Sequence, residues 1–209
     1  MSGIPLLHTP DTFNPNRPGP VYDFTDAPSD VRSIIHCINF LGDDLVGAEI
    51  GVCKGFSFMT LLHNCSIKKL YGVDSYLPYD DYLIEKYDGV TANYSIDEKQ
   101  IKYNRAVCYN NIEYSGHKDK VIFLEKDSND AANDIEDASL DFIFIDTYMT
   151  YEQACQDIET WYPKVKPGGI FAGHDYRCPV IEQVITNFRK KNNIDNRMSI
   201  FDNTFIWYK

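Results

Sequence analysis

Five apolar segments alternate with five helical segments along the chain, and this alternation restricts its fold more than any other feature. The expected strands cover residues 45–51, 68–74, 120–125, 139–146 and 168–175. The expected helices that follow them cover residues 56–65, 96–116, 128–135, 150–165 and 179–192. Alternating strands and helices form a parallel sheet with helices on both faces. The sequence therefore predicts an α/β fold with a Rossmann-like, doubly wound, mostly parallel sheet.

The end of the chain departs from this alternation. Two apolar segments, 198–202 and 204–209, follow each other directly around Asp202 and Asn203. So short a turn joins antiparallel strands, because parallel neighbours need a long crossover. We therefore expect seven strands, the last two forming a C-terminal antiparallel hairpin.

The chain divides into two parts of unequal size. Residues 1–28 are rich in proline and predict an extended N-terminal arm, followed by a single domain over residues 29–209. The segment between Asp74 and Val121 is much longer than the dozen or so residues that a crossover needs. Its excess, residues 76–96, is rich in tyrosine and acidic residues and is interpreted as a substrate cap. An oligomer contact and a plain surface excursion are the alternatives.

The charge and hydropathy of the sequence argue against nucleic acid and membranes as partners. The formal net charge is -11 and the sequence pI about 4.8, so no basic face for nucleic acid is expected. No segment approaches the roughly 20 apolar residues of a membrane span, and the N-terminus lacks the apolar core of a signal peptide. We expect a cytoplasmic protein without nucleic-acid or membrane partners. Aromatic residues in the arm and the cap are compatible with a homodimer.

Acidic residues occur at the ends of all five expected parallel strands. Ligands of such sheets bind beyond the carboxyl ends of the strands, where the strand order reverses. One acidic residue at a strand end is common in turns and helix caps, but five at one edge point to a site. The five residues are Glu49, Asp74, Asp127, Asp146 and Asp175.

A glycine turn follows the first strand, with the sequence Gly51-Val52-Cys53-Lys54-Gly55. A dinucleotide fingerprint needs a middle glycine for the approach of a pyrophosphate, and here Cys53 replaces it. No Gly-Lys-Ser/Thr follows, which excludes a P-loop. The turn alone does not show whether it binds a small cofactor or serves packing only.

The rest of the sequence resembles the class I S-adenosylmethionine-dependent methyltransferases. The subgroup it resembles contains small-molecule O-methyltransferases with a Gly-His-Asp-Tyr motif, similar to methyltransferase family 24. The matching segments are "EIGVCKG", "YGVDSY", "FLEKDS" and the stretch from "LDFIFID" to "PGGIFAGHDY", within residues 46–180. The last segment is the most specific of them.

The resemblance implies a binding site for S-adenosylmethionine. The methionine part would lie over Gly51, Val52, Cys53 and Gly55, with Glu49 ordering the turn or meeting the amino group. Asp74, followed by Ser75, would accept hydrogen bonds from the ribose diol, a geometry that a carboxylate satisfies. Asp127 would accept from the adenine amino group, and Ser128 would donate to a ring nitrogen. Asp146 is a further candidate at the cofactor.

Two designs remain open for the reacting end, where a small-molecule hydroxyl must lose its proton. In one, His174 is the general base, because an ordinary histidine titrates near neutral pH. In the other, Asp146 and Asp175 hold Mg²⁺, as related catechol-type and macrolide-sugar enzymes do, and the ion lowers the pKa of the hydroxyl. His174 as a loop-orienting residue and Asp175 as a helix N-cap near Pro179 are the structural alternatives.

One departure from the subgroup keeps other functions open. After the fourth strand the subgroup often has Asp-Gly-x-His, whereas this chain has Asp146-Thr147-Tyr148-Met149. Met149 can neither hold Mg²⁺ nor take a proton, which leaves a non-catalytic cofactor-binding module as an alternative. An NAD-dependent oxidoreductase or epimerase is the other, disfavoured by the missing middle glycine and by the closing hairpin.

Overall fold

The computed structural model describes residues 29–78, 98–147, 150–201 and 203–209. The arm predicted for residues 1–28, and all but the first residues of the cap predicted for residues 76–96, lie outside this part of the chain. Met149 and Asp202 lie outside it as well.

The described strands form one seven-stranded sheet in the order β3-β2-β1-β4-β5-β7-β6. Strands β1 to β5 pair in parallel, and β7 pairs antiparallel with both β5 and β6. The predicted doubly wound α/β fold with a closing hairpin is confirmed. The strands are β1 (Leu45–Ile50), β2 (Ile67–Val73), β3 (Val121–Leu124), β4 (Leu140–Ile145), β5 (Val165–Gly173), β6 (Met198–Phe201) and β7 (Thr204–Tyr208).

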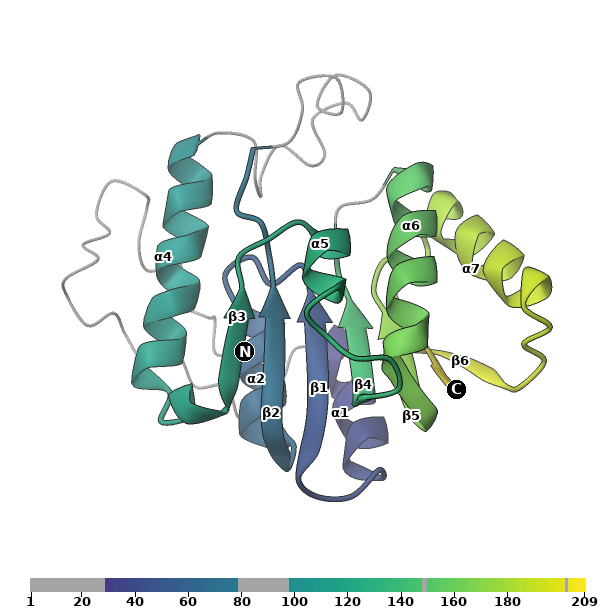
Figure 1. Cartoon of the computed structure of the whole chain (residues 1–209), viewed down its shortest axis with the longest axis horizontal. Coiled ribbons are helices and arrows are strands. Elements are labelled where there is room, and N and C mark those ends of the chain that lie inside the picture. The colour runs from purple at the N-terminus through teal and green to yellow at the C-terminus, as the bar shows by residue number, and fades with distance from the viewer. Residues whose placement is uncertain (1–28, 79–97, 148–149, 202) are drawn as a thin grey trace.

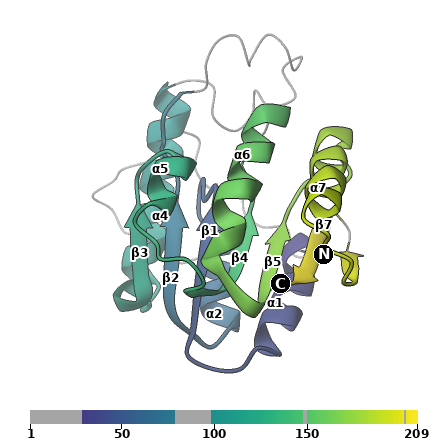
Figure 2. The ribbon, with the colours of Figure 1, turned by 45° about the vertical axis from the view of Figure 1, so that its right-hand side comes forward.

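Helices cover both faces of the sheet (Figures 1 and 2). One face carries α1 (Ser29–Asn39), α2 (Phe56–Asn64) and α4 (Glu98–Tyr114), and the other carries α5 (Ser128–Ala132), α6 (Tyr151–Trp161) and α7 (Pro179–Lys191). Each layer encloses its own apolar core, and β4 contributes to both, with Phe142 and Phe144 on one side and Ile143 and Ile145 on the other. This two-sided burial explains why β4 is almost continuously apolar.

The helix predicted for residues 150–165 ends earlier than expected. Helix α6 stops at Trp161, a 3₁₀ turn covers Tyr162–Lys164, and β5 begins at Val165. Pro163 is the physical reason, because proline has no backbone N–H to continue the hydrogen bonds of the helix.

The topology places a switch point between two central strands. From β1 the chain winds outward through β2 to β3 and then returns to β4 on the other side of β1. The loops after β1 and β4 therefore meet at the carboxyl edge, where ligands of such sheets bind. Within the described ranges, no helix is long and apolar enough to cross a membrane.

Candidate functional site

The glycine turn after β1 packs directly against the loop after β4. The backbone is left-handed at Gly51 (φ 89°), Cys53 (φ 51°) and Gly55 (φ 79°). A Cβ added at Gly51 would lie 2.2 Å from the backbone oxygen of Asp146. Only glycine tolerates both this backbone conformation and this contact. Gly55 is the N-cap of α2 and supplies no side-chain cap, an arrangement that suits an anionic group at the start of that helix.

Asp74, at the end of β2, is bonded to the same turn. Its Oδ2 accepts from the backbone N–H of Cys53 at 2.8 Å, and its Oδ1 accepts from the N–H of Tyr76 at 2.9 Å. The Tyr76 hydroxyl donates to the Cys53 carbonyl at 2.7 Å. Burial raises the pKa of Asp74, and the backbone N–H donors oppose that rise. The carboxylate thus joins β2 to the turn, and its contact with a ribose stays a prediction.

The neighbours of these residues differ in what they can offer a ligand. The Val52 side chain is buried in the core beside α2, so only its backbone can face a cofactor. The Ser75 hydroxyl accepts a hydrogen bond from the Leu77 N–H at 3.3 Å.

Glu49, at the end of β1, is a fully buried acid. Its Oε1 accepts a hydrogen bond of 2.5 Å from the Ser57 hydroxyl, and its Oε2 has no hydrogen-bond partner in the described part of the chain. Burial raises the pKa of Glu49 well above its usual range, and the charges of Asp146 and Asp74 add to the rise. A buried carboxylate oxygen without a partner is costly. The site therefore fits a ligand that brings an N–H donor, such as the ammonium group of S-adenosylmethionine.

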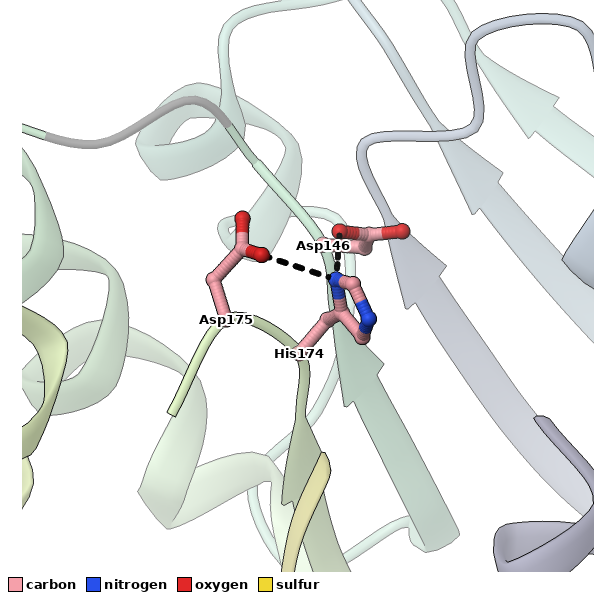
Figure 3. Close-up of side chains that lie close together, drawn as sticks. All are labelled: Asp146, His174 and Asp175. Atoms are coloured by element: carbon pink, nitrogen blue, oxygen red, sulfur yellow. Dashed lines mark ion pairs between the residues drawn. The ribbon is translucent and has the colours of Figure 1, made fainter. Parts of the chain in front are cut away.

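Three potential metal ligands converge beyond β4 and β5 (Figure 3). His174 Nδ1 lies 3.1 Å from Asp175 Oδ1 and 3.5 Å from Asp146 Oδ1. One ligand atom from each of the three residues lies within 4.8 Å of the others. The two carboxylates suit Mg²⁺ or Mn²⁺, whereas an imidazole binds a metal ion only in its neutral form. The structure thus brings together the three residues that the two sequence designs had used separately.

The protonation of His174 differs from the sequence expectation. Hydrogen bonds to Asp146 and then Asp175 raise the pKa of His174 to about 10, although burial lowers it. The assumption that His174 titrates near neutral pH is therefore wrong for this arrangement, because the imidazole is protonated there. Its positive charge compensates the two carboxylates, and the His174 hydrogen bond lowers the pKa of Asp175.

Asp175 does not cap a helix. The N-cap of α7 is Cys178, which makes no side-chain cap hydrogen bond. The Asp175 backbone is left-handed (φ 58°), and its carboxylate contacts His174 and the Asn203 side-chain amide. The helix-cap alternative raised by the sequence is therefore excluded.

The end of β3 contributes differently from the prediction. The Asp127 carboxylate is the N-cap of α5 and accepts from the Asn129 N–H at 2.9 Å. The Ser128 hydroxyl accepts from Trp161 Nε1 at 2.8 Å and hydrogen-bonds the buried carboxylate of Asp157. Because this hydroxyl is engaged on both sides, the structure does not give it the predicted role of donor to an adenine nitrogen. The contact of Asp127 with adenine stays a prediction.

Sequence reasoning missed three residues that hold the site together. Ser57 bonds Glu49, Asp157 accepts from Thr147 at 3.0 Å in the loop after β4, and Asn203 bonds Asp175. Ser57 could have been predicted from the sequence, since it lies in the first turn of the helix that follows the glycine turn. Asp157 and Asn203 carried no such signal, because their partners are distant in sequence.

Comparison with known proteins identifies the fold. A family model described as a methyltransferase domain matches residues 48–176, more than half of the chain. The O-methyltransferase NovP superposes with a TM-score of 0.61 at 20% identity, over 86% of this chain and 78% of NovP. The calicheamicin methyltransferase CalS11 superposes with a TM-score of 0.60 at 15% identity, over the same shares of the two chains.

A third solved structure with the same fold is described as a decarboxylase rather than a methyltransferase. Precorrin 8W decarboxylase from Methanobacterium thermoautotrophicum superposes with a TM-score of 0.55 at 16% identity, over 94% of this chain and 95% of that protein. At such identities the similarity concerns the fold alone. No curated protein sequence matches the chain significantly.

Proposed function

Because the chain belongs to the methyltransferase domain family, we propose that it transfers the methyl group of S-adenosylmethionine to a hydroxyl oxygen of a small molecule. Methylation that depends on S-adenosylmethionine follows from the family, and the hydroxyl acceptor is our proposal. One observation carries it: the cluster of Asp146, His174 and Asp175 adjoins the glycine turn, whose Gly51 packs on the Asp146 backbone. A methyl donor on that turn and an acceptor at the cluster would be neighbours.

The cofactor would use three groups around the turn. The unpartnered Oε2 of Glu49 would accept from the ammonium group, and the start of α2 would meet the carboxylate. Asp74, already oriented by two backbone N–H groups, would accept from the ribose hydroxyls with its remaining lone pairs.

Asp146 and Asp175 would hold a divalent cation, with Mg²⁺ the expected ion, while the protonated His174 would hydrogen-bond the two carboxylates. When bound, such a cation lowers the pKa of a coordinated hydroxyl and orients it. The site fits this role, because two carboxylate oxygens lie within 4.8 Å of each other at the edge where a cofactor is expected.

The reaction also requires the acceptor hydroxyl to lose its proton near the side chains of the cluster. Methyl transfer to oxygen requires the hydroxyl proton to leave, and the attacking oxygen must be aligned with the methyl carbon. While His174 is protonated it cannot accept that proton. His174 would then orient the two carboxylates.

Calorimetric titration tests the cofactor. Purified protein is titrated with S-adenosylhomocysteine, with and without Mg²⁺, and with NAD as the control. We expect micromolar binding of S-adenosylhomocysteine and no binding of NAD. A folded protein that binds NAD and not S-adenosylhomocysteine would contradict the proposal and revive the oxidoreductase alternative.

Methyl transfer to a panel of small diols and sugars tests the acceptor. We expect Mg²⁺-dependent turnover that is lost in Asp146→Asn and retained in Asp130→Asn, a matched change of an exposed acid on α5. Binding of S-adenosylhomocysteine without turnover of any hydroxyl acceptor would favour the non-catalytic module instead.

A further inference from the structure

We propose that Asn203, in the turn between β6 and β7, is a positioning residue that holds Asp175 in its metal-binding orientation. This inference rests on the proposed function, since it assumes that Asp146 and Asp175 hold a divalent cation. It adds to the site an element of the C-terminal hairpin, which is remote in sequence from every other member.

Asn203 makes three hydrogen bonds to consecutive residues of the loop after β5. Its Nδ2 donates to Asp175 Oδ1 at 3.0 Å, its backbone carbonyl accepts from the Tyr176 N–H at 2.9 Å, and its Oδ1 accepts from the Arg177 N–H at 2.8 Å. Both polar atoms of the side-chain amide and the backbone oxygen are therefore used on a single loop.

An asparagine is required for this pattern. The loop presents a carboxylate, which needs a donor, beside a backbone N–H, which needs an acceptor. The asparagine amide supplies both in one planar group, and only one orientation of the amide satisfies both partners. Alanine supplies neither.

Asp175 needs external support because of its backbone. A residue other than glycine in the left-handed region is strained, and such strain persists where the surroundings hold it. The Asp175 carboxylate lies beside His174, so the same bond that restrains the loop also orients a potential metal ligand. Asn203 and His174 both contact Oδ1 of that carboxylate, so Oδ2 is the oxygen that a cation would meet.

Sheet pairing explains how the hairpin reaches the site. Strand β7 runs antiparallel to β5 with Gly173 opposite Phe205, so the start of β7 lies beside the end of β5. A Cβ at Gly173 would lie 2.4 Å from the Phe205 ring, which shows how closely the two strands pack. Asn203, which directly precedes β7, is thereby held next to residues 175–177.

The inference is tested by titrating two variants with Mn²⁺ and monitoring the bound ion by electron paramagnetic resonance. The variants are Asn203→Ala and Asn203→Leu, and the second keeps the side-chain size. We expect the Mn²⁺ dissociation constant to rise about tenfold or more in both variants, as it does when other residues that hydrogen-bond a metal ligand are replaced. The dissociation constant for S-adenosylhomocysteine should change less than about twofold. Loss of metal affinity with retained cofactor affinity separates positioning from general unfolding.

Asn196→Ala is the matched control. Asn196 precedes β6, and its side-chain amide bonds the Tyr208 carbonyl, so it anchors the same hairpin away from Asp175. We expect it to leave Mn²⁺ affinity unchanged. Wild-type affinity for Mn²⁺ in folded Asn203→Ala, or an equal loss in Asn196→Ala, would overturn the assignment of Asn203. A wild-type protein that binds S-adenosylhomocysteine but no divalent cation would overturn the metal site itself, and this inference with it.

Discussion

At the scale of single residues, the structure disfavours the charged form of one side chain and favours the charged form of another. Glu49 is a buried acid without full hydrogen bonding, whereas His174 is a cation between two carboxylates. Burial opposes the charge of Glu49, and hydrogen bonds to Asp146 and Asp175 sustain the charge of His174. Each group therefore couples binding or stability to pH in a direction that can be measured.

Glu49→Gln should stabilise the ligand-free protein and weaken cofactor binding. Because burial raises the pKa of Glu49, the folded protein keeps this carboxyl protonated above pH 4.5, where the unfolded chain ionises it. The wild type therefore loses stability as the pH rises above 4.5, and the amide avoids that loss. The free energy of unfolding in urea should exceed that of the wild type by an amount that grows with pH. The affinity for S-adenosylhomocysteine should fall about 10- to 100-fold, the value of a hydrogen bond to a charged group.

Ser57→Ala controls for the local environment of Glu49, because it removes the hydroxyl donor and keeps the carboxylate. It should retain most of the cofactor affinity. Unchanged affinity for S-adenosylhomocysteine in Glu49→Gln would exclude Glu49 from the cofactor site.

His174→Asn should lower stability in a pH-dependent way in chelator-treated protein. The pKa of His174 is raised from 6.5 to about 10, so its stabilisation is fully present below about pH 6.5 and is lost as the pH rises through about 10. Urea unfolding at several pH values should show the wild-type advantage shrinking from pH 6.5 to pH 10. An advantage that stays constant across this range would mean that the imidazole is not a cation in the fold.

At the scale of elements, the site depends on contacts between loops. The glycine turn contacts the loop after β4 through Gly51, and the buried Asp157 of α6 accepts from Thr147 in that same loop and from Gln153. Burial raises the pKa of Asp157, and the hydrogen bonds from Ser128, Thr147 and Gln153 oppose the rise. Thr147, which stands where the resembling subgroup has glycine, thus connects the loop that carries Asp146 to α6.

Gly51→Ala should prevent cofactor binding and strongly destabilise the fold. The new Cβ would meet the Asp146 backbone oxygen at 2.2 Å, and neither backbone segment can move without disturbing β1 and β4. Gly168→Ala is the matched control, because its φ of 83° is close to the 89° of Gly51 and a Cβ there meets nothing within 4 Å. We expect a loss of about 1 kcal/mol for the control from backbone strain alone.

Urea unfolding and calorimetry of the two variants provide the measurement. The loss in Gly51→Ala should exceed the loss in the control by about 1–3 kcal/mol, the usual cost of forced overpacking. Equal losses in the two variants would show that the contact with Asp146 is relaxed in solution.

At the scale of the whole molecule, charge limits the choice of partner. The formal net charge of -11 opposes association with the nucleic-acid backbone. We expect no retention of duplex DNA in a mobility-shift titration at about 50 mM salt, a concentration at which even nonspecific phosphate contacts are strong. Binding that weakens steeply with added salt would reveal a local basic surface and contradict this expectation.

The sequence by itself determined the order of the elements and the edge that carries the site. Alternating apolar and helical segments encode the parallel sheet. Short-range patterns place Glu49 at the end of β1 and place Asp74, Asp146 and Asp175 after β2, β4 and β5. These features depend on local spacing and on topological rules that hold for any such sheet. The end of α6 was missed, although Pro163 is a local signal, because the helical periodicity continues past it.

Only the tertiary structure decided how the side chains at that edge meet. The grouping of His174 with Asp146 and Asp175, the Gly51 contact with Asp146 and the position of Asn203 beside Asp175 all join segments that are distant in sequence. The pKa of His174 follows from this grouping, because it depends on distances of a few ångströms between charges. Strand register and close packing set such distances, and a sequence pattern contains neither.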